Sequence, residues 1–359
     1  MLPQNTERAV FALRELYASR GYRPYKMSRF EEYALYVRNK EFLSSDQIIT
    51  FPARDGRLLA LKPDVTLSIV KNAPRKPGAV EKVYYSESVF RADASGVMRE
   101  LTQTGLECVG DLKEYDIGEV VLLAARSLRL LGKQCILDIS HMGLIGSVLN
   151  GIPEPLRQQA AGCLQQKNIH GLQELDIPER EKLITLVENA GRAAQVLPAL
   201  TEMLNSDREK EALSELCRIV AILEDQGFGD CLRIDFSLCG GMAYYNGIVF
   251  CGYLAGIPDG VLSSGQYDRL ASGMGGNSRA IGFAVYVDLL EQLENDRQAD
   301  VDAVLLISGT EDCVLIQRAA EELGRKGSVR LCCALPEDCC PRQVYMLVNG
   351  KAVSWDGNG

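Results

Sequence analysis

The alternation of apolar and polar positions is clearest over residues 83–109. Residues 83–90 form a run of β-forming side chains, and residues 101–109 alternate apolar with polar ones. A short loop with a glycine separates the two runs, so the pattern predicts an antiparallel hairpin. Because side chains alternate with period two, Gln103, Gly105 and Glu107 are expected on one face of the second strand. That face is either a solvated polar surface or a site for a small zwitterion or anion.

Spacings of three and four residues predict helices in other parts of the chain. Helices are expected at residues 5–20, 62–73 and 112–134, and the pattern is wholly helical from about 152 to 229. Strands are expected at residues 22–30, 135–140 and 232–238. Hairpins are expected at residues 47–61, where Asp55-Gly56 is a strong turn signal, and at residues 239–256.

The last sixty residues have a pattern of their own. It reads as strand, helix, strand and strand, with the final strand over residues 344–355. The order predicts a small α/β unit at residues 298–359. The preceding core is therefore expected to span residues 1–297, with the helical segment 152–229 as an insertion.

Composition narrows the possible functions. The 359 residues carry 39 Lys and Arg against 48 Asp and Glu, a net charge of −9, which argues against a large nucleic-acid surface. No apolar run reaches the length of a membrane span, and residues 1–13 lack the plan of a signal peptide. The 12 cysteines are scattered through apolar stretches, which suits a reducing compartment. A cytoplasmic location is expected.

Metal chemistry is not indicated by the sequence. His141 and His170 are isolated from each other, so they form neither a metal site nor a triad, and His141 is interpreted as structural. Two adjacent-cysteine pairs, Cys332-Cys333 and Cys339-Cys340, lack the CxxC spacing of a zinc knuckle. No metal, no cofactor and no catalytic residue are predicted.

The hairpin resembles motif 2 of class II aminoacyl-tRNA synthetases, in the histidyl branch. The matching residues are Phe90-Arg91, Arg99, Gln103, Gly105 and Glu107. The helix and strand of residues 5–30 resemble motif 1, the dimer-forming element of this class.

Further stretches match the histidyl family in part. Around residue 64 the family's Arg-Pro-Glu-Gly-Thr is matched at Pro63 and Thr66, while Asp64 replaces the longer carboxylate. Asp64 could receive an α-ammonium group, or it could simply be an acid at a helix N-terminus. The histidine-specific signature keeps two tyrosines at residues 244–245. The remaining matches are Gly265, Tyr267, Asp268, Gly275, Gly276, Gly282 and Phe283.

Two arginines with which members of this family bind ATP are absent from the sequence. Gly240 stands where the histidine-specific arginine is expected, and Leu289 stands where the motif 3 arginine is expected. Losing one charge contact to a transition state typically costs roughly 3–4 kcal/mol, so adenylation is expected to fail. The pattern is a histidine pocket without its ATP-binding arginines.

That combination resembles the regulatory subunits of ATP phosphoribosyltransferase, a family of histidyl-synthetase paralogues. The resemblance implies an α+β fold, with a class II synthetase-like antiparallel sheet flanked by helices and a C-terminal remnant of an anticodon-binding-like domain. It implies a non-catalytic dimer that activates a short catalytic subunit and conveys feedback by L-histidine. The implied histidine-binding residues are Asp64, Thr66, Arg91, Gln103, Glu107, Tyr244 and Tyr245. The alternatives are a histidyl-tRNA synthetase with substituted ATP contacts and a paralogue with another binding role.

Overall fold

The computed structural model describes residues 4–40, 42–43, 47–74, 76–92, 95–240, 244–274, 278–292, 301–335 and 339–355. The chain divides into two compact units, Met1–Leu293 and Glu294–Gly359. Each unit is described by itself.

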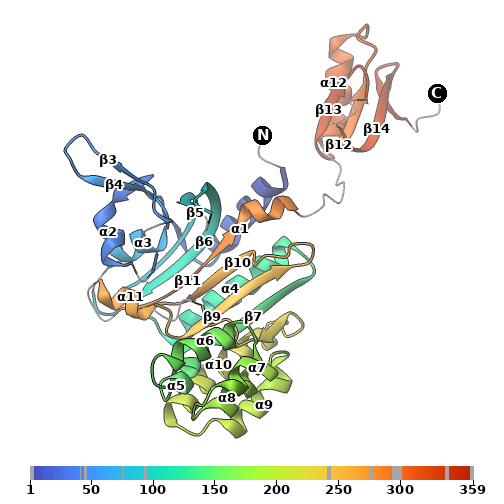
Figure 1. The fold of residues 1–359 in the computed structure, drawn as a ribbon. Helices are drawn as coiled ribbons and strands as arrows, with labels where there is room; N and C mark the ends of the chain where they lie inside the picture. The colour runs from blue at the N-terminus through green and yellow to red at the C-terminus, as the bar shows by residue number, and fades with distance from the viewer. Residues whose placement is uncertain are drawn as a thin grey trace. The chain divides into compact units, whose positions relative to one another are not determined.

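An eight-stranded sheet forms the centre of the first unit (Figure 1). Its strands in spatial order are β1 (Arg23–Pro24), β5 (Val80–Ala92), β6 (Met98–Gly110), β11 (Arg279–Tyr286), β10 (Leu262–Gln266), β9 (Ile248–Leu254), β7 (Cys135–His141) and β8 (Leu232–Ile234). The inner pairs are antiparallel, while β1 pairs with β5 and β7 with β8 in parallel. The expected antiparallel sheet is therefore mixed at its two edges.

The predicted hairpin is confirmed as β5 and β6. Arg91 lies opposite Arg99 next to the connecting loop, and β6 also pairs with β11, so β6 lies inside the sheet. Residues 103–110 of β6 are buried throughout, on both faces of the strand. A solvated polar face is thus excluded for Gln103 and Glu107, which are 3% and 2% exposed.

Helices cover one face of this sheet. α1 (Gln4–Ala18) and α4 (Glu114–Leu131) pack against each other and against the strands. Tyr17 of α1 contacts the Phe283 ring edge-on, with ring centroids 5.8 Å apart, and its hydroxyl lies 3.0 Å from Ser127 Oγ on α4. A buried hydrogen bond therefore fixes how these two helices meet above the sheet.

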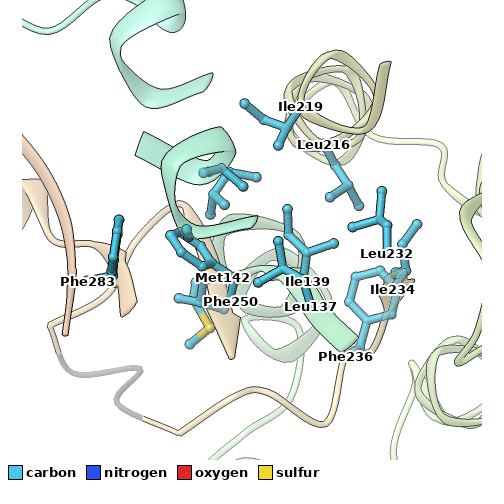
Figure 2. Packing of buried hydrophobic residues seen from close by; sticks show 14 of the residues in the cluster. Leu137, Ile139, Met142, Leu216, Ile219, Leu232, Ile234, Phe236, Phe250 and Phe283 are labelled. Atoms are coloured by element: carbon cyan, nitrogen blue, oxygen red, sulfur yellow. The ribbon is translucent and has the colours of Figure 1, made fainter. Parts of the chain in front are cut away.

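The predicted helical insertion follows β7. It comprises α5 (Met142–Leu149), α6 (Leu156–Gln165), α7 (Ile169–Glu174), α8 (Arg180–Glu188), α9 (Ala193–Met203) and α10 (Asp207–Asp225). Figure 2 shows Leu216 and Ile219 of α10 beside Leu137 and Ile139 of β7. This shared apolar cluster joins the insertion to the sheet. His141, at the end of β7, is structural as predicted: its Nε2 lies 2.9 Å from Glu215 of α10.

Three elements near the N-terminus differ from the prediction. The strand expected at residues 22–30 is reduced to β1, which is followed by one more backbone hydrogen bond, from the Tyr25 amide to the Tyr84 carbonyl. A separate three-stranded sheet holds β2 (Phe30–Glu32), β4 (Leu58–Leu61) and β3 (Thr50–Pro52), and the last two form the predicted hairpin. α3 (Thr66–Asn72) begins four residues later than expected, since Lys62 instead pairs through its backbone with Arg29 and Phe90.

The hairpin expected at residues 239–256 is wrong. Its described residues contribute one strand, β9, which pairs with β7 and β10 and not with another part of the segment. Residues 241–243 lie outside the described residues, as do Gly275 and Gly276. α11 (Asp268–Gly273) follows β10, and a short 3-10 helix, η2 (Val287–Gln292), stands where the motif 3 helix is expected.

The described residues of the second unit form a four-stranded sheet and one helix. Its elements are β12 (Val301–Leu306), α12 (Cys313–Gly324), β13 (Val329–Cys332), β14 (Pro341–Val348) and β15 (Lys351–Ser354), in the spatial order β13-β12-β14-β15. The last predicted strand is thus two strands joined at Asn349-Gly350, where both residues have positive φ. That dipeptide is a common signal for a tight hairpin turn, so a single strand over residues 344–355 is wrong.

Within the described part of the chain, no helix is long and apolar enough to cross a membrane. The same residues contain no group of three or more His, Cys, Asp and Glu side chains placed to hold a metal ion.

Candidate functional site

All seven residues that the sequence proposed for histidine line one pocket in the first unit. Asp64 and Thr66 lie at the start of α3, Arg91 ends β5, Gln103 and Glu107 lie on β6, and Tyr244-Tyr245 precede β9. The pocket volume is about 120 Å³. Sites for drug-sized ligands typically exceed about 300 Å³, so this pocket suits a small polar molecule such as an amino acid.

Glu107 is the most enclosed polar group in the pocket. Thr66 Oγ1 donates a 2.6 Å hydrogen bond to its Oε1, and the Tyr267 hydroxyl donates one to its Oε2. Gly282 lies directly opposite on β11, and a Cβ at that position would overlap the Glu107 carboxylate. A glycine on the neighbouring strand is therefore what allows the carboxylate to lie there.

The pKa of Glu107 is strongly shifted. Burial raises it, and the nearby Asp64 raises it further, while the hydrogen bonds from Thr66 and Tyr267 lower it; the resulting pKa is about 8. Tyr267 has a pKa well above its ordinary value, chiefly because it is buried, and remains protonated. At neutral pH the Glu107 carboxyl is thus mostly neutral, and a cationic or donating ligand group would favour its ionised form.

Asp64 and Arg91 form a second polar corner. Asp64 Oδ1 accepts a 2.7 Å hydrogen bond from the Leu67 amide at the start of α3, as an acid at a helix N-terminus does. Burial raises the pKa of Asp64, and the positive charge of Arg91 opposes that rise. Arg91 Nε donates a 2.5 Å hydrogen bond to the carbonyl of Pro63. Asp64 therefore both accepts a hydrogen bond from the first turn of the helix and lines the pocket, so the two interpretations of this residue are compatible.

Aromatic rings close another side. The Tyr244 and Tyr245 ring centroids lie 4.2 Å apart, and Phe42 meets Tyr244 edge-on at 5.0 Å. The sequence interpretation did not place Phe42, Tyr85 or Tyr267 in the site. Only Tyr267 had a signal, because it belongs to a matched family stretch.

The two substituted arginine positions lie away from the pocket lining. Leu289 packs against the main apolar core, and a Cβ at Gly240 would lie 3.7 Å from Gln165 Nε2 of the helical insertion. Arg99 is exposed at the start of β6 and does not line the pocket. Among the described lining residues, Arg91 alone is cationic.

We expect Glu107→Gln to change how stability depends on pH. The folded-state pKa of about 8 exceeds the ordinary value of 4.5, so the folded protein holds this proton more tightly than the unfolded chain does. The wild type should therefore lose unfolding free energy as pH rises from 4.5 to 8, and the variant should not. Between pH 5 and 8 the wild type should lose about 3–4 kcal/mol of unfolding free energy relative to the variant. Urea unfolding at several pH values measures it, and parallel curves for the two proteins would contradict the assignment.

Comparisons with known proteins agree on one family. A family model described as histidyl-tRNA synthetase matches residues 2–290. The ATP phosphoribosyltransferase regulatory subunit of Caldanaerobacter subterraneus subsp. tengcongensis is 30% identical over 296 residues, which cover 77% of this chain and 75% of that protein. The regulatory subunit of Alkaliphilus metalliredigens is 28% identical over 295 residues, covering 78% and 74%.

Solved structures share the fold. A Bacillus halodurans protein described as an ATP phosphoribosyltransferase regulatory subunit/histidyl-tRNA synthetase has a TM-score of 0.74 at 24% identity, covering 92% of this chain and 89% of that one. A chain of the ATP phosphoribosyl transferase (HisG:HisZ) complex from Thermotoga maritima has a TM-score of 0.63 at 19% identity, covering 79% and 97%. This chain therefore belongs to the histidyl-tRNA synthetase family and, within it, to the ATP phosphoribosyltransferase regulatory subunits.

Proposed function

We propose that this chain is a non-catalytic regulatory subunit that activates a short ATP phosphoribosyltransferase catalytic subunit and conveys inhibition by L-histidine. The observation that carries the proposal is the pocket: it has the size and polar groups for an amino acid, and Arg91 is the one cation among its described lining residues. The names of the most similar relatives support the same role.

The proposed ligand pose follows from charge. Asp64 and Thr66, at the start of α3, receive the α-ammonium group of histidine. Arg91 lies near Asp64 and can pair with the α-carboxylate through its guanidinium group. Gln103 and Glu107, on the same face of β6, hydrogen-bond the imidazole, and Tyr244 and Tyr245 flank it.

Two residue substitutions disfavour the adenylation reaction of a synthetase. A synthetase stabilises negative charge on the α-phosphate with guanidinium groups, and here glycine and leucine occupy two of the family's arginine positions, 240 and 289. Each missing contact costs roughly 3–4 kcal/mol of transition-state stabilisation. We therefore propose that the chain has lost the synthetase reaction and kept the amino-acid pocket.

Feedback requires histidine to bind two states of the complex with different affinity, a coupling of typically about 1–3 kcal/mol. The Thermotoga maritima neighbour comes from a complex of two kinds of subunit, which supports a hetero-oligomer here. Self-association through the helix and strand of motif 1 and through the sheet, together with a cytoplasmic location, completes the proposal.

The test is phosphoribosyltransferase activity of the short catalytic subunit from the same organism, measured with and without this chain and titrated with histidine. We expect activity to require the chain and to fall as histidine is added. A chain that leaves the activity unchanged overturns the proposal. Histidine-dependent exchange of ATP with pyrophosphate by the purified chain would instead support a working synthetase.

A further inference from the structure

A second, larger cleft lies within the first unit, between the helical insertion, α11 and the segment that precedes β9. Its volume is about 800 Å³, and its walls come from α5, α6, the first turn of α10, α11 and residues 245–246. Tyr245 lines both this cleft and the pocket of about 120 Å³ described above. The larger volume falls in the usual range for nucleotide- or drug-sized ligands.

Three arginines from different elements surround the cleft. Arg157 of α6 is held by a 3.0 Å hydrogen bond from its Nε to the Ile152 carbonyl, and it lies 3.7 Å from Glu154. Arg208 of α10 and Arg269 of α11 form no ion pair with any residue that the structure describes. Both side chains are exposed, and Glu154 and Glu211 also line the cleft, so its described lining has three cationic and two anionic side chains. The planar forks of the arginines suit the oxygens of a phosphate.

Two glycines on the helices that line the cleft have no neighbouring atom that would exclude a larger side chain. Gly146 lies inside α5 and Gly162 inside α6, and a Cβ at either position would meet nothing within 4 Å. A glycine inside a helix costs about 1 kcal/mol relative to alanine. Gly143, by contrast, has a reason, since a Cβ there would lie 2.9 Å from the His141 ring. The two unexplained glycines keep the wall of the cleft flat.

The remaining lining supplies the other features of a nucleotide site. Met142 and Leu149 are only 4% and 3% exposed, so the surface open to a base comes from Gln158, Ala161 and Gln165 of α6, and the two glutamines offer amide groups for its edge. Glu211, one turn along α10 from Arg208, can accept hydrogen bonds from ribose hydroxyls. We infer that this cleft binds a phosphate-bearing nucleotide, with Arg208 and Arg269 as the phosphate contacts.

The inference goes beyond the proposed function, because nucleotide binding here requires neither a catalytic subunit nor histidine. The shared Tyr245 gives it a regulatory consequence. A ligand that fixes one side of this side chain changes the wall of the histidine pocket, so the two ligands are expected to alter each other's affinity equally.

The experiment is calorimetric titration of the full chain with AMP and with ATP, with and without saturating histidine. We expect saturable binding that is tighter for ATP, because it carries more phosphate charge. Arg208→Ala combined with Arg269→Ala should weaken it at least about tenfold. Gly162→Leu should block the cleft while preserving α6, since leucine favours helix.

Arg180→Ala is the matched control. Arg180 is also an arginine of the helical insertion, it is half-exposed, and it lies outside the cleft, so nucleotide affinity should not change. Absence of saturable binding to the wild type, or equal affinity in the double variant, overturns the inference. Histidine titrations of the same samples keep the two proposals separate, because loss of nucleotide binding alone leaves the histidine site intact.

Discussion

Replacing Glu107 with alanine is expected to weaken histidine binding about 100-fold and to abolish histidine inhibition of the catalytic subunit. Its side chain is 2% exposed, and it accepts hydrogen bonds from both Thr66 and Tyr267. A hydrogen bond to a buried charged partner typically contributes about 1.5–3 kcal/mol, and the lost contact also leaves the ligand's donor unpaired. Calorimetric titration with histidine gives the change in affinity directly.

Glu100→Ala is the matched control. Glu100 lies on the same strand, β6, but is exposed near the loop, so its loss should leave histidine affinity unchanged. Glu107→Gln separates charge from shape, because it keeps the shape but cannot ionise: its amide oxygen accepts from one of the Thr66 and Tyr267 hydroxyls, and its NH2 group donates to the other. If all three variants bind histidine as the wild type does, the ligand does not occupy this pocket.

Replacing Lys62 with methionine is expected to lower the free energy of unfolding by about 3–5 kcal/mol. Lys62 forms an ion pair with Glu87 of β5, and their side chains are only 1% and 14% exposed. Removing one partner leaves a buried carboxylate without its counter-charge, which is the costly way to break such a pair. Urea unfolding followed by circular dichroism measures the loss.

Lys71→Met provides the comparison at the surface. Lys71 also pairs with a glutamate, Glu31, at 3.0 Å, but its side chain is 44% exposed. Exposed ion pairs are worth about 0–1 kcal/mol, so this variant should unfold almost as the wild type does. Replacing Glu87 by glutamine in the Lys62→Met background should recover part of the loss. Equal losses of unfolding free energy in the Lys62→Met and Lys71→Met variants would show that burial does not determine the cost of breaking an ion pair.

The seven pocket residues could be predicted because their signals are local. Gln103 and Glu107 share a strand face by parity, and the tyrosine pair and Thr66 stand in short stretches that match a family. The contact between Glu107 and Tyr267 could not be predicted, because the two residues are separated by 160 positions and meet only through the order of strands in the sheet.

The errors in the predicted fold have equally specific causes. Pro63 favours the first turn of a helix. The structure instead holds Lys62 through backbone hydrogen bonds with Arg29 and Phe90. Both partners are far from Lys62 in the sequence, so no local pattern indicates these bonds. The Lys62–Glu87 pair has no sequence signal, since a lysine beside a strand is usually solvated. The turn at Asn349-Gly350, by contrast, has a local signal, because this dipeptide favours the positive φ values that a tight hairpin requires.

The position of β11 between β6 and β10 also determines when the pocket can exist during protein synthesis. Thr66 is 41 residues from Glu107, but Gly282 and Tyr267 follow only after the whole helical insertion has been translated. The insertion helices make mostly local contacts and can form earlier on the ribosome. Until β11 emerges, the nascent chain has β6 as an open strand edge, the kind of surface on which another chain can add. The ligand pocket is thus among the last parts of the unit to form, and closing it removes an aggregation-prone edge.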